Sequence, residues 1–132
     1  MSIGPSRREQ IDRFLVDEID SIPQLEALLL LWRDCSRDWS REEIGKSLYI
    51  SPDAARAVLR HLEQHNLVRE VDGNAGRYAL VLDSQERRDM LADVTEVYRY
   101  ELVRITNLIH GKASRAVRDF AGAFRFKREE RK

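Results

Sequence analysis

The chain has 132 residues, of which 42% are hydrophobic and 35% are charged, a composition that favours one globular domain and excludes an intrinsically disordered segment. Its longest apolar run, residues 27–32, is far shorter than the ~20 residues that a transmembrane helix needs, and residues 1–10 do not resemble a signal peptide. The 23 basic and 23 acidic residues cancel, so the overall charge gives no indication of nucleic-acid binding. The single cysteine, Cys35, forms no internal disulfide, and we expect a cytoplasmic protein.

The first part of the chain, residues 1–39, is predicted to form two helices that pack on the core. Apolar residues at helical spacing favour a helix over residues 6–19. Ser21 and Gln24 then have the spacing of a capping box, so a second helix is expected to begin there. Residues 25–32 are apolar almost all round, which predicts burial of this second helix against several neighbours.

Two further capping signals in the centre of the chain predict a helix-turn-helix. Ser40 and Glu43 have the capping-box spacing and precede a short helix, which ends in a tight turn at residues 49–50. Ser51 is expected to cap the next helix, and Asn66 to end it in a left-handed conformation. The expected buried positions of this helix share one face: Ala55, Val58, Leu59 and Leu62.

Two short β-type runs follow, at residues 67–71 and 77–82. The segment between them, Asp-Gly-Asn-Ala-Gly at residues 72–76, is a strong turn signal, so the runs predict a β-hairpin. Two short helices followed by a hairpin indicate a winged helix-turn-helix, which we place at residues 40–82. The predicted fold class is therefore mainly α, a winged helix-turn-helix with a short β-hairpin wing and flanking N- and C-terminal helices.

The last part of the chain, residues 83–132, is predicted to be helical. Periodicity favours one long helix over residues 84–110, which Gly111 is expected to stop. Its apolar stripe is broader than packing on one small domain requires, so we expect a homodimer built by this helix with the first and last helices. A last amphipathic helix and a basic tail complete the chain, with eight basic against three acidic side chains in residues 111–132. Such a tail either touches phosphates or an acidic partner, or is a solvated terminus.

The segment IGKSLYISPDAARAVLRHLEQHNLV, residues 44–68, resembles winged-helix transcription regulators and is most similar to the MarR family. The segment RYALVLD, residues 77–83, resembles that family's second wing strand and the entry to its long helix. The resemblance implies a DNA-binding transcriptional regulator in which helices before and after the wing build a dimer. We therefore expect double-stranded DNA as a partner, a homodimer, and no membrane association.

The candidate DNA-binding residues lie mainly on the face of the second central helix that is opposite its buried side. A recognition helix enters the major groove and presents side chains to base edges and phosphates. We expect Arg56 to read a base and Arg60 to hold a phosphate, while small residues let the backbone approach closely. Residues of the supporting helix and the wing complete the candidate set: Lys46, Ser47, Asp53, Ala54, Arg56, Ala57, Arg60 and Arg77.

A second interpretation keeps the fold and changes the partner. Residues 40–82 contain six bases and six acids, so a module that docks on another regulator, such as a sigma factor or signalling protein, stays open. His61 and His65 have a spacing found in metal sites, but without a convincing third ligand two surface histidines are favoured. We expect no metal, no cofactor and no catalytic residue, since no phosphate loop or nucleophile motif occurs.

Aromatic residues at helical spacing more often belong to a core than to a ligand pocket. We apply this interpretation to the aromatic side chains that a pocket between the wing and the dimer helices would use. We interpret Cys35 as a structural or idle thiol rather than a redox sensor. These aromatic residues are Trp32, Trp39, Tyr49, Tyr98 and Tyr100.

Overall fold

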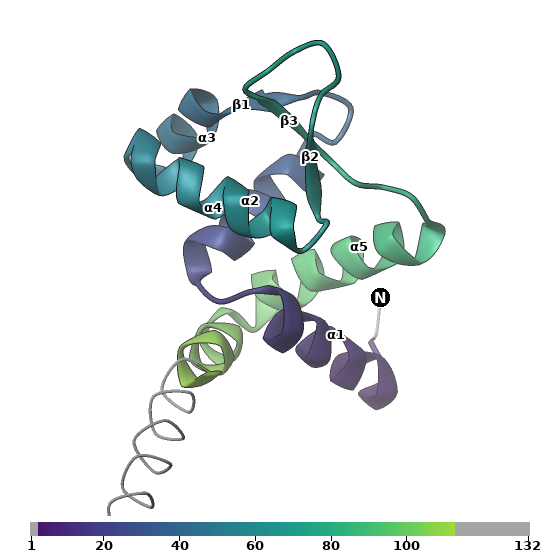
Figure 1. Ribbon diagram of the computed structural model, residues 1–132. Helices are drawn as coiled ribbons and strands as arrows, with labels where there is room; N and C mark the ends of the chain where they lie inside the picture. The colour runs from purple at the N-terminus through teal and green to yellow at the C-terminus, as the bar shows by residue number, and fades with distance from the viewer. Residues whose placement is uncertain (1–2, 113–132) are drawn as a thin grey trace, which may run out of the picture.

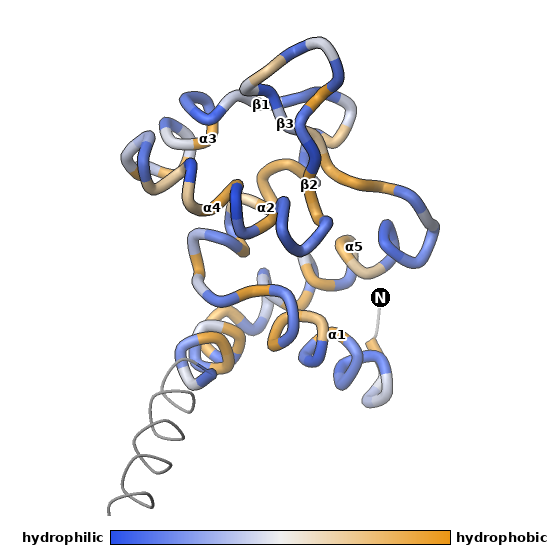
Figure 2. Tube along the Cα trace, viewed as in Figure 1, coloured by the Kyte–Doolittle hydropathy of each residue, from blue (hydrophilic) through white to orange (hydrophobic). Residues whose placement is uncertain are grey.

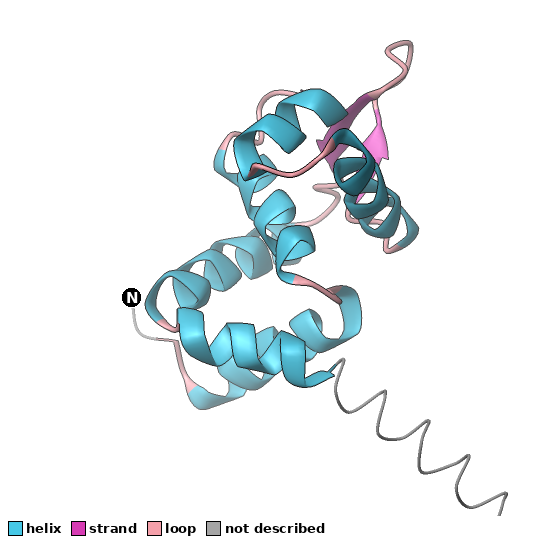
Figure 3. Cartoon of the chain, turned by 90° about the vertical axis from the view of Figure 1, so that its left-hand side faces the viewer, coloured by secondary structure: helices cyan, strands magenta, loops and turns pink. Residues whose placement is uncertain are grey.

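The computed structural model describes residues 3–112 and confirms a mainly helical chain with a small antiparallel sheet (Figure 1). The helix-turn-helix and the sheet form one layer, and α1, α5 and a helix at residues 102–112 form the other (Figure 3). The predicted last amphipathic helix and the basic tail lie outside the described residues. Within residues 3–112, no helix is both long and apolar enough to cross a membrane.

Two N-terminal helices form as predicted, α1 (Pro5–Glu18) and α2 (Ile22–Arg33). The Ser21 side chain caps α2 by accepting a hydrogen bond from the backbone N–H of Gln24 at 3.4 Å. Hydrophobic residues are frequent along α2 (Figure 2), which contacts α3, α4, α5 and the sheet. Leu25, Leu28 and Leu31 are fully buried there, so α2 is the centre around which the other elements pack.

The helix-turn-helix consists of α3 (Arg41–Leu48) and α4 (Pro52–Gln64). Ser40 and Glu43 form the predicted capping box, because each side chain accepts a hydrogen bond from the other's backbone N–H. Ser51 accepts from the backbone N–H of Ala54 at 3.1 Å, and Asn66 is left-handed with φ 58°. The four predicted core residues of α4 are all buried: Ala55, Val58, Leu59 and Leu62.

The hairpin is also present, as β2 (Val68–Glu70) and β3 (Arg77–Leu80), with Val68 opposite Leu80. A third strand that we did not predict, β1 (Trp39–Ser40), pairs with the other side of β3, giving the order β1-β3-β2. A strand of two residues has too little alternation to be recognised from a sequence. Pairing with β1 gives the wing a second attachment, immediately before α3.

The prediction of one long helix over residues 84–110 is wrong. Helix α5 (Gln85–Tyr100) ends at Glu101, which has φ −129° and ψ 44°, and the chain resumes a helix at residues 102–112. The Glu101 carboxylate accepts hydrogen bonds from Arg8 and Arg104, which stabilise the break, and Ile105 beyond it is fully buried. Gly111 does not stop this helix, since residues 111 and 112 are still helical.

Candidate nucleic-acid interface

The outer side of α4 is the surface on which the sequence placed most candidate DNA-binding residues. Asp53, Ala54, Arg56, Ala57 and Arg60 are all exposed, on the side away from the buried face of the helix. The small side chains of the two alanines leave room for close approach of another molecule to the helix backbone. Helix α4 therefore presents two arginines on an accessible surface, next to the wing.

Two arginines on α4 and a lysine on α3 are exposed and available to bind another molecule. Within residues 3–112, Arg56, Arg60 and Lys46 form no ion pair, whereas arginines elsewhere, such as Arg7 and Arg104, each contact two carboxylates. An arginine without an internal partner binds a phosphate without first giving up a hydrogen bond. Arg56 and Arg60 are thus accessible on the second helix of the helix-turn-helix, as are arginines elsewhere in residues 3–112 that form no ion pair, such as Arg33 and Arg88.

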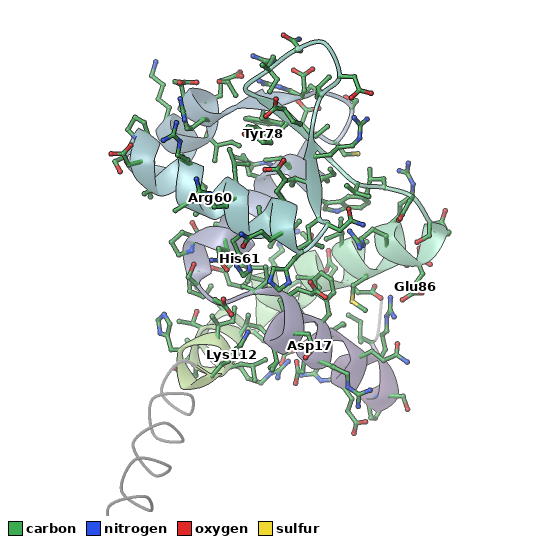
Figure 4. All side chains as sticks on the ribbon, viewed as in Figure 1. Asp17, Arg60, His61, Tyr78, Glu86 and Lys112 are labelled. Atoms are coloured by element: carbon green, nitrogen blue, oxygen red, sulfur yellow. The ribbon has the colours of Figure 1, made fainter. Side chains whose placement is uncertain are left out.

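A groove of about 560 Å³ separates the N-terminal part of α4 from the wing. Arg56 lines it from α4, Asn74 and Gly76 line it from the wing loop, and Tyr78 lines it from β3. Tyr78 lies between α4 and the wing, while Arg60 projects from α4 (Figure 4). Burial raises the pKa of Tyr78, with a further contribution from the charge of Glu70, so its hydroxyl stays protonated and able to donate a hydrogen bond.

Arg77 was expected to contact DNA from the wing, and the structure places its guanidinium against two carboxylates of the protein. Its Nε donates to Asp38 at 2.5 Å and its Nη2 donates to Glu43 at 3.0 Å. The hydrogen bond to Asp38 is the main cause of the raised pKa of Arg77. Arg37 also pairs with Glu43, so the four side chains form a locally neutral cluster that joins β3 to the start of α3.

Glu43 has the most perturbed carboxyl group in this cluster. The backbone N–H of Ser40 lowers the pKa of Glu43 to about 2, and hydrogen bonding and charge from Arg37 act in the same direction. Sequence reasoning identified Glu43 as a capping residue only. Its second role as a partner of Arg77 had no sequence signal, because the two residues are 34 positions apart.

The two candidates on α3 face different surroundings. Lys46 is exposed and lines a groove beside the first residues of α4. Ser47 is also exposed but lines a separate, more apolar groove of about 560 Å³ between α2, α3 and α5, together with Trp32 and Tyr98. The structure therefore brings Lys46, but not Ser47, close to the start of α4. Of the five aromatic residues considered for a pocket, only Trp32 and Tyr98 line this groove.

His61 and His65 form a stacked pair on α4, with ring centroids 4.2 Å apart. Nε2 of His61 is 2.7 Å from the backbone oxygen of Glu18, and Nδ1 of His65 is 2.8 Å from the Glu18 carboxylate. Both rings thus link α4 to the end of α1. No group of three potential metal ligands occurs within residues 3–112, and the contacts observed for the two histidines are ring stacking and hydrogen bonds.

Solved structures with a similar architecture include proteins from two bacteria. The Mycobacterium tuberculosis MarR-family protein Rv2887 matches 89% of this chain and 83% of its own, with a TM-score of 0.52 and 19% identity. Rv1404 from the same organism matches 85% of this chain and 78% of its own, with a TM-score of 0.52 and 25% identity. A mutant of Staphylococcus aureus MepR bound to an oligodeoxyribonucleotide matches 89% of this chain and 88% of its own, with a TM-score of 0.50 and 14% identity.

The chain has a MarR-like winged-helix fold. The match to Rv2887 covers far more than residues 40–82, so the similarity to that MarR-family structure includes the flanking helices. MepR is a transcription regulator of the multidrug efflux pump MepA. No protein-family model and no curated protein matches this sequence.

Proposed function

We propose that this protein is a DNA-binding transcriptional regulator that inserts α4 into the major groove. The observation that carries the proposal is the exposed pair Arg56 and Arg60, which have no ion-pair partner within residues 3–112, on the second helix of a winged helix-turn-helix. The DNA-bound MepR mutant supports it, because that protein has the same fold. Residues 40–82 are net neutral, so the proposal depends on the positions of Arg56 and Arg60 and not on an overall basic charge.

The individual residues take different roles in this proposal. Arg56 lines the groove between α4 and the wing, and we assign it base recognition by hydrogen bonds to a guanine edge. Arg60 and Lys46 hold phosphates, while Arg77 positions the wing through its two carboxylate partners. Ala54 and Ala57 let the backbone of α4 approach the duplex. The Asp53 carboxylate repels phosphates, and Ser47 has no role in this contact because it lines the separate groove between α2, α3 and α5.

A homodimer is the second part of the proposal. Three large apolar side chains are exposed around the break after α5: Tyr100 at 73%, Leu102 at 52% and Val103 at 72%. Grouped exposed apolar residues of this kind favour burial against another chain, and a second copy would bring two α4 helices to one duplex. The two helices would read half-sites about one helical turn apart, roughly 34–36 Å.

The alternative is a winged helix that docks on another regulator without binding DNA. The observation that favours it is the acidic side chains interspersed among the cations, namely Asp53 and Glu63 on α4 and Glu70 and Asp72 in the wing. These carboxylates repel phosphates and weaken non-specific binding to DNA.

Selection of bound sequences from a random DNA pool separates the two functions. For a dimeric regulator we expect an enriched, roughly palindromic motif with half-sites one helical turn apart. The same selection with the Arg56→Ala variant should give a motif that is degenerate at one position of each half-site. If no motif is enriched even at low salt, the DNA-binding proposal is wrong and the docking module becomes the better account.

A further inference from the structure

We propose that Tyr49, in the turn between α3 and α4, contacts the sugar-phosphate backbone of bound DNA, an inference that rests on the proposed DNA-binding function. Its side chain is 96% exposed, more than any other large hydrophobic side chain that is exposed in residues 3–112. A ring in this position packs against nothing in the core. Its presence is therefore not explained by the stability of the fold.

The backbone conformation of Tyr49 is unusual for an aromatic residue. Tyr49 is the C-cap of α3 and adopts φ 58° and ψ 42°, the left-handed region that glycine occupies without steric cost. Within residues 3–112, the only other residue besides glycine with a positive φ is Asn66, and asparagine tolerates this region well. A bulky aromatic residue here adds local strain, and such strain often marks a residue with a function outside the fold.

The residues around Tyr49 indicate which part of a bound DNA duplex its ring would contact. Glu42, Lys46 and Tyr49 are spaced four and three residues apart, and all three are exposed, so they form one row along α3. The groove of about 380 Å³ that Lys46 lines is also lined by Ile50, which follows Tyr49, and by Pro52, the first residue of α4. Two acidic residues of α3, Glu42 and Glu43, line it as well. Tyr49 therefore lies between a cation that we assign to a phosphate and the beginning of the recognition helix.

The chemistry of a phenol suits a backbone contact rather than base recognition. Tyrosine hydroxyl groups are among the donors that bind phosphate oxygens and sugars in DNA complexes. The ring is neutral, so the contact releases no counterion and adds affinity without adding salt dependence. This separates Tyr49 from Lys46, whose contribution falls as the salt concentration rises.

The test is the Tyr49→Gly variant of the full chain. Glycine removes the ring and also relieves the left-handed backbone, so the melting temperature should be unchanged or should rise by up to roughly 3–6 °C. The affinity for a labelled mixed-sequence duplex of about 30 base pairs, three helical turns, should fall about fivefold at low salt, which is the effect of one neutral hydrogen bond. Fluorescence anisotropy at several salt concentrations measures both the affinity and its salt slope.

Asn66→Gly is the matched control, because Asn66 has the same φ at the opposite end of α4. The Asn66→Gly variant should have the melting temperature of the wild type and the same affinity for the duplex. If Tyr49→Gly binds the duplex as tightly as wild type, the inference is wrong. The inference is also wrong if Asn66→Gly shows the same fivefold loss, because a loss common to both variants comes from a change in the fold and not from the ring. A reduced salt slope for Tyr49→Gly also overturns it. If the wild type binds no duplex, the proposed function itself fails.

Discussion

The guanidinium of Arg77 lies 3.0 Å from the carboxylate of Glu43, so the second wing strand is tied to the first turn of α3. Glu43 also caps that helix through Ser40, and one carboxylate therefore stabilises a helix end and orients the wing. The wing and the recognition helix line the same groove, so this ion pair helps to set the shape of the candidate interface.

Acid should weaken the fold through Glu43. Its pKa is lowered to about 2 in the folded chain, so its ionised form stabilises the fold above the ordinary value of 4.5, and this contribution is lost as the pH falls from about 5 towards 2. The Glu43→Gln variant should be less stable than wild type at pH 7 and should lose less stability in this acid range. Urea unfolding at pH 7 and pH 3 measures both effects. Glu63→Gln, an exposed residue on α4 without an ion pair in residues 3–112, is the control and should behave like wild type.

Arg56 and Arg60 should be separable by the kind of binding that each supports. Arg56→Ala should cost ~1–3 kcal/mol on the preferred site and relax sequence preference, whereas Arg60→Ala should weaken all sequences alike and reduce the salt slope by about 1. Titrations on selected and scrambled duplexes at several salt concentrations distinguish these results. Arg88→Ala removes an exposed cation on α5 and should change neither quantity. Unchanged binding by Arg56→Ala would remove the base-reading role from this residue.

A charged side chain introduced among the exposed apolar residues at positions 100–103 should dissociate the proposed dimer. Val103 is 72% exposed, so Val103→Glu should leave the monomer folded while burying an unpaired charge in any interface formed there. Light scattering should then give a mass close to that of one 15.5 kDa chain instead of twice that mass. Ala75→Glu in the exposed wing loop is the control and should leave the mass unchanged. A wild type that stays at 15.5 kDa at every concentration would contradict the homodimer.

The centre of α2 should dominate the stability of the fold. Leu28 is fully buried where α2 meets the other elements, and Leu28→Ala should lower the free energy of unfolding by about 2–5 kcal/mol through lost burial and a cavity. Val71→Ala, at a partly exposed position of the wing and outside the proposed dimer surface, should cost much less. Chemical denaturation monitored by circular dichroism compares the two. Similar losses for both variants would show that α2 is not the core of the fold.

Signals that act within one helical turn were predictable from the sequence. The caps at Ser21, Ser40 and Ser51 each depend on a backbone N–H three residues later, so residue type and spacing suffice to predict them. Asn66 and the buried face of α4 follow from the same local rules, since the helical period determines which side chains share a face. These local features are enough to predict the helix-turn-helix and the hairpin.

Features that depend on distant partners were decided only by the tertiary structure. The break after α5 occurs where Glu101 meets Arg8, a residue 93 positions away, and helical periodicity carries no information about such a contact. The roles of Arg77 and β1 depend in the same way on Asp38 and on β3. Along the chain a capping serine and its partner are always close, whereas an arginine and a remote carboxylate meet only after the core around α2 has brought their elements together. Packing therefore decides which arginines are held in ion pairs and which, like Arg56 and Arg60, stay accessible on the surface.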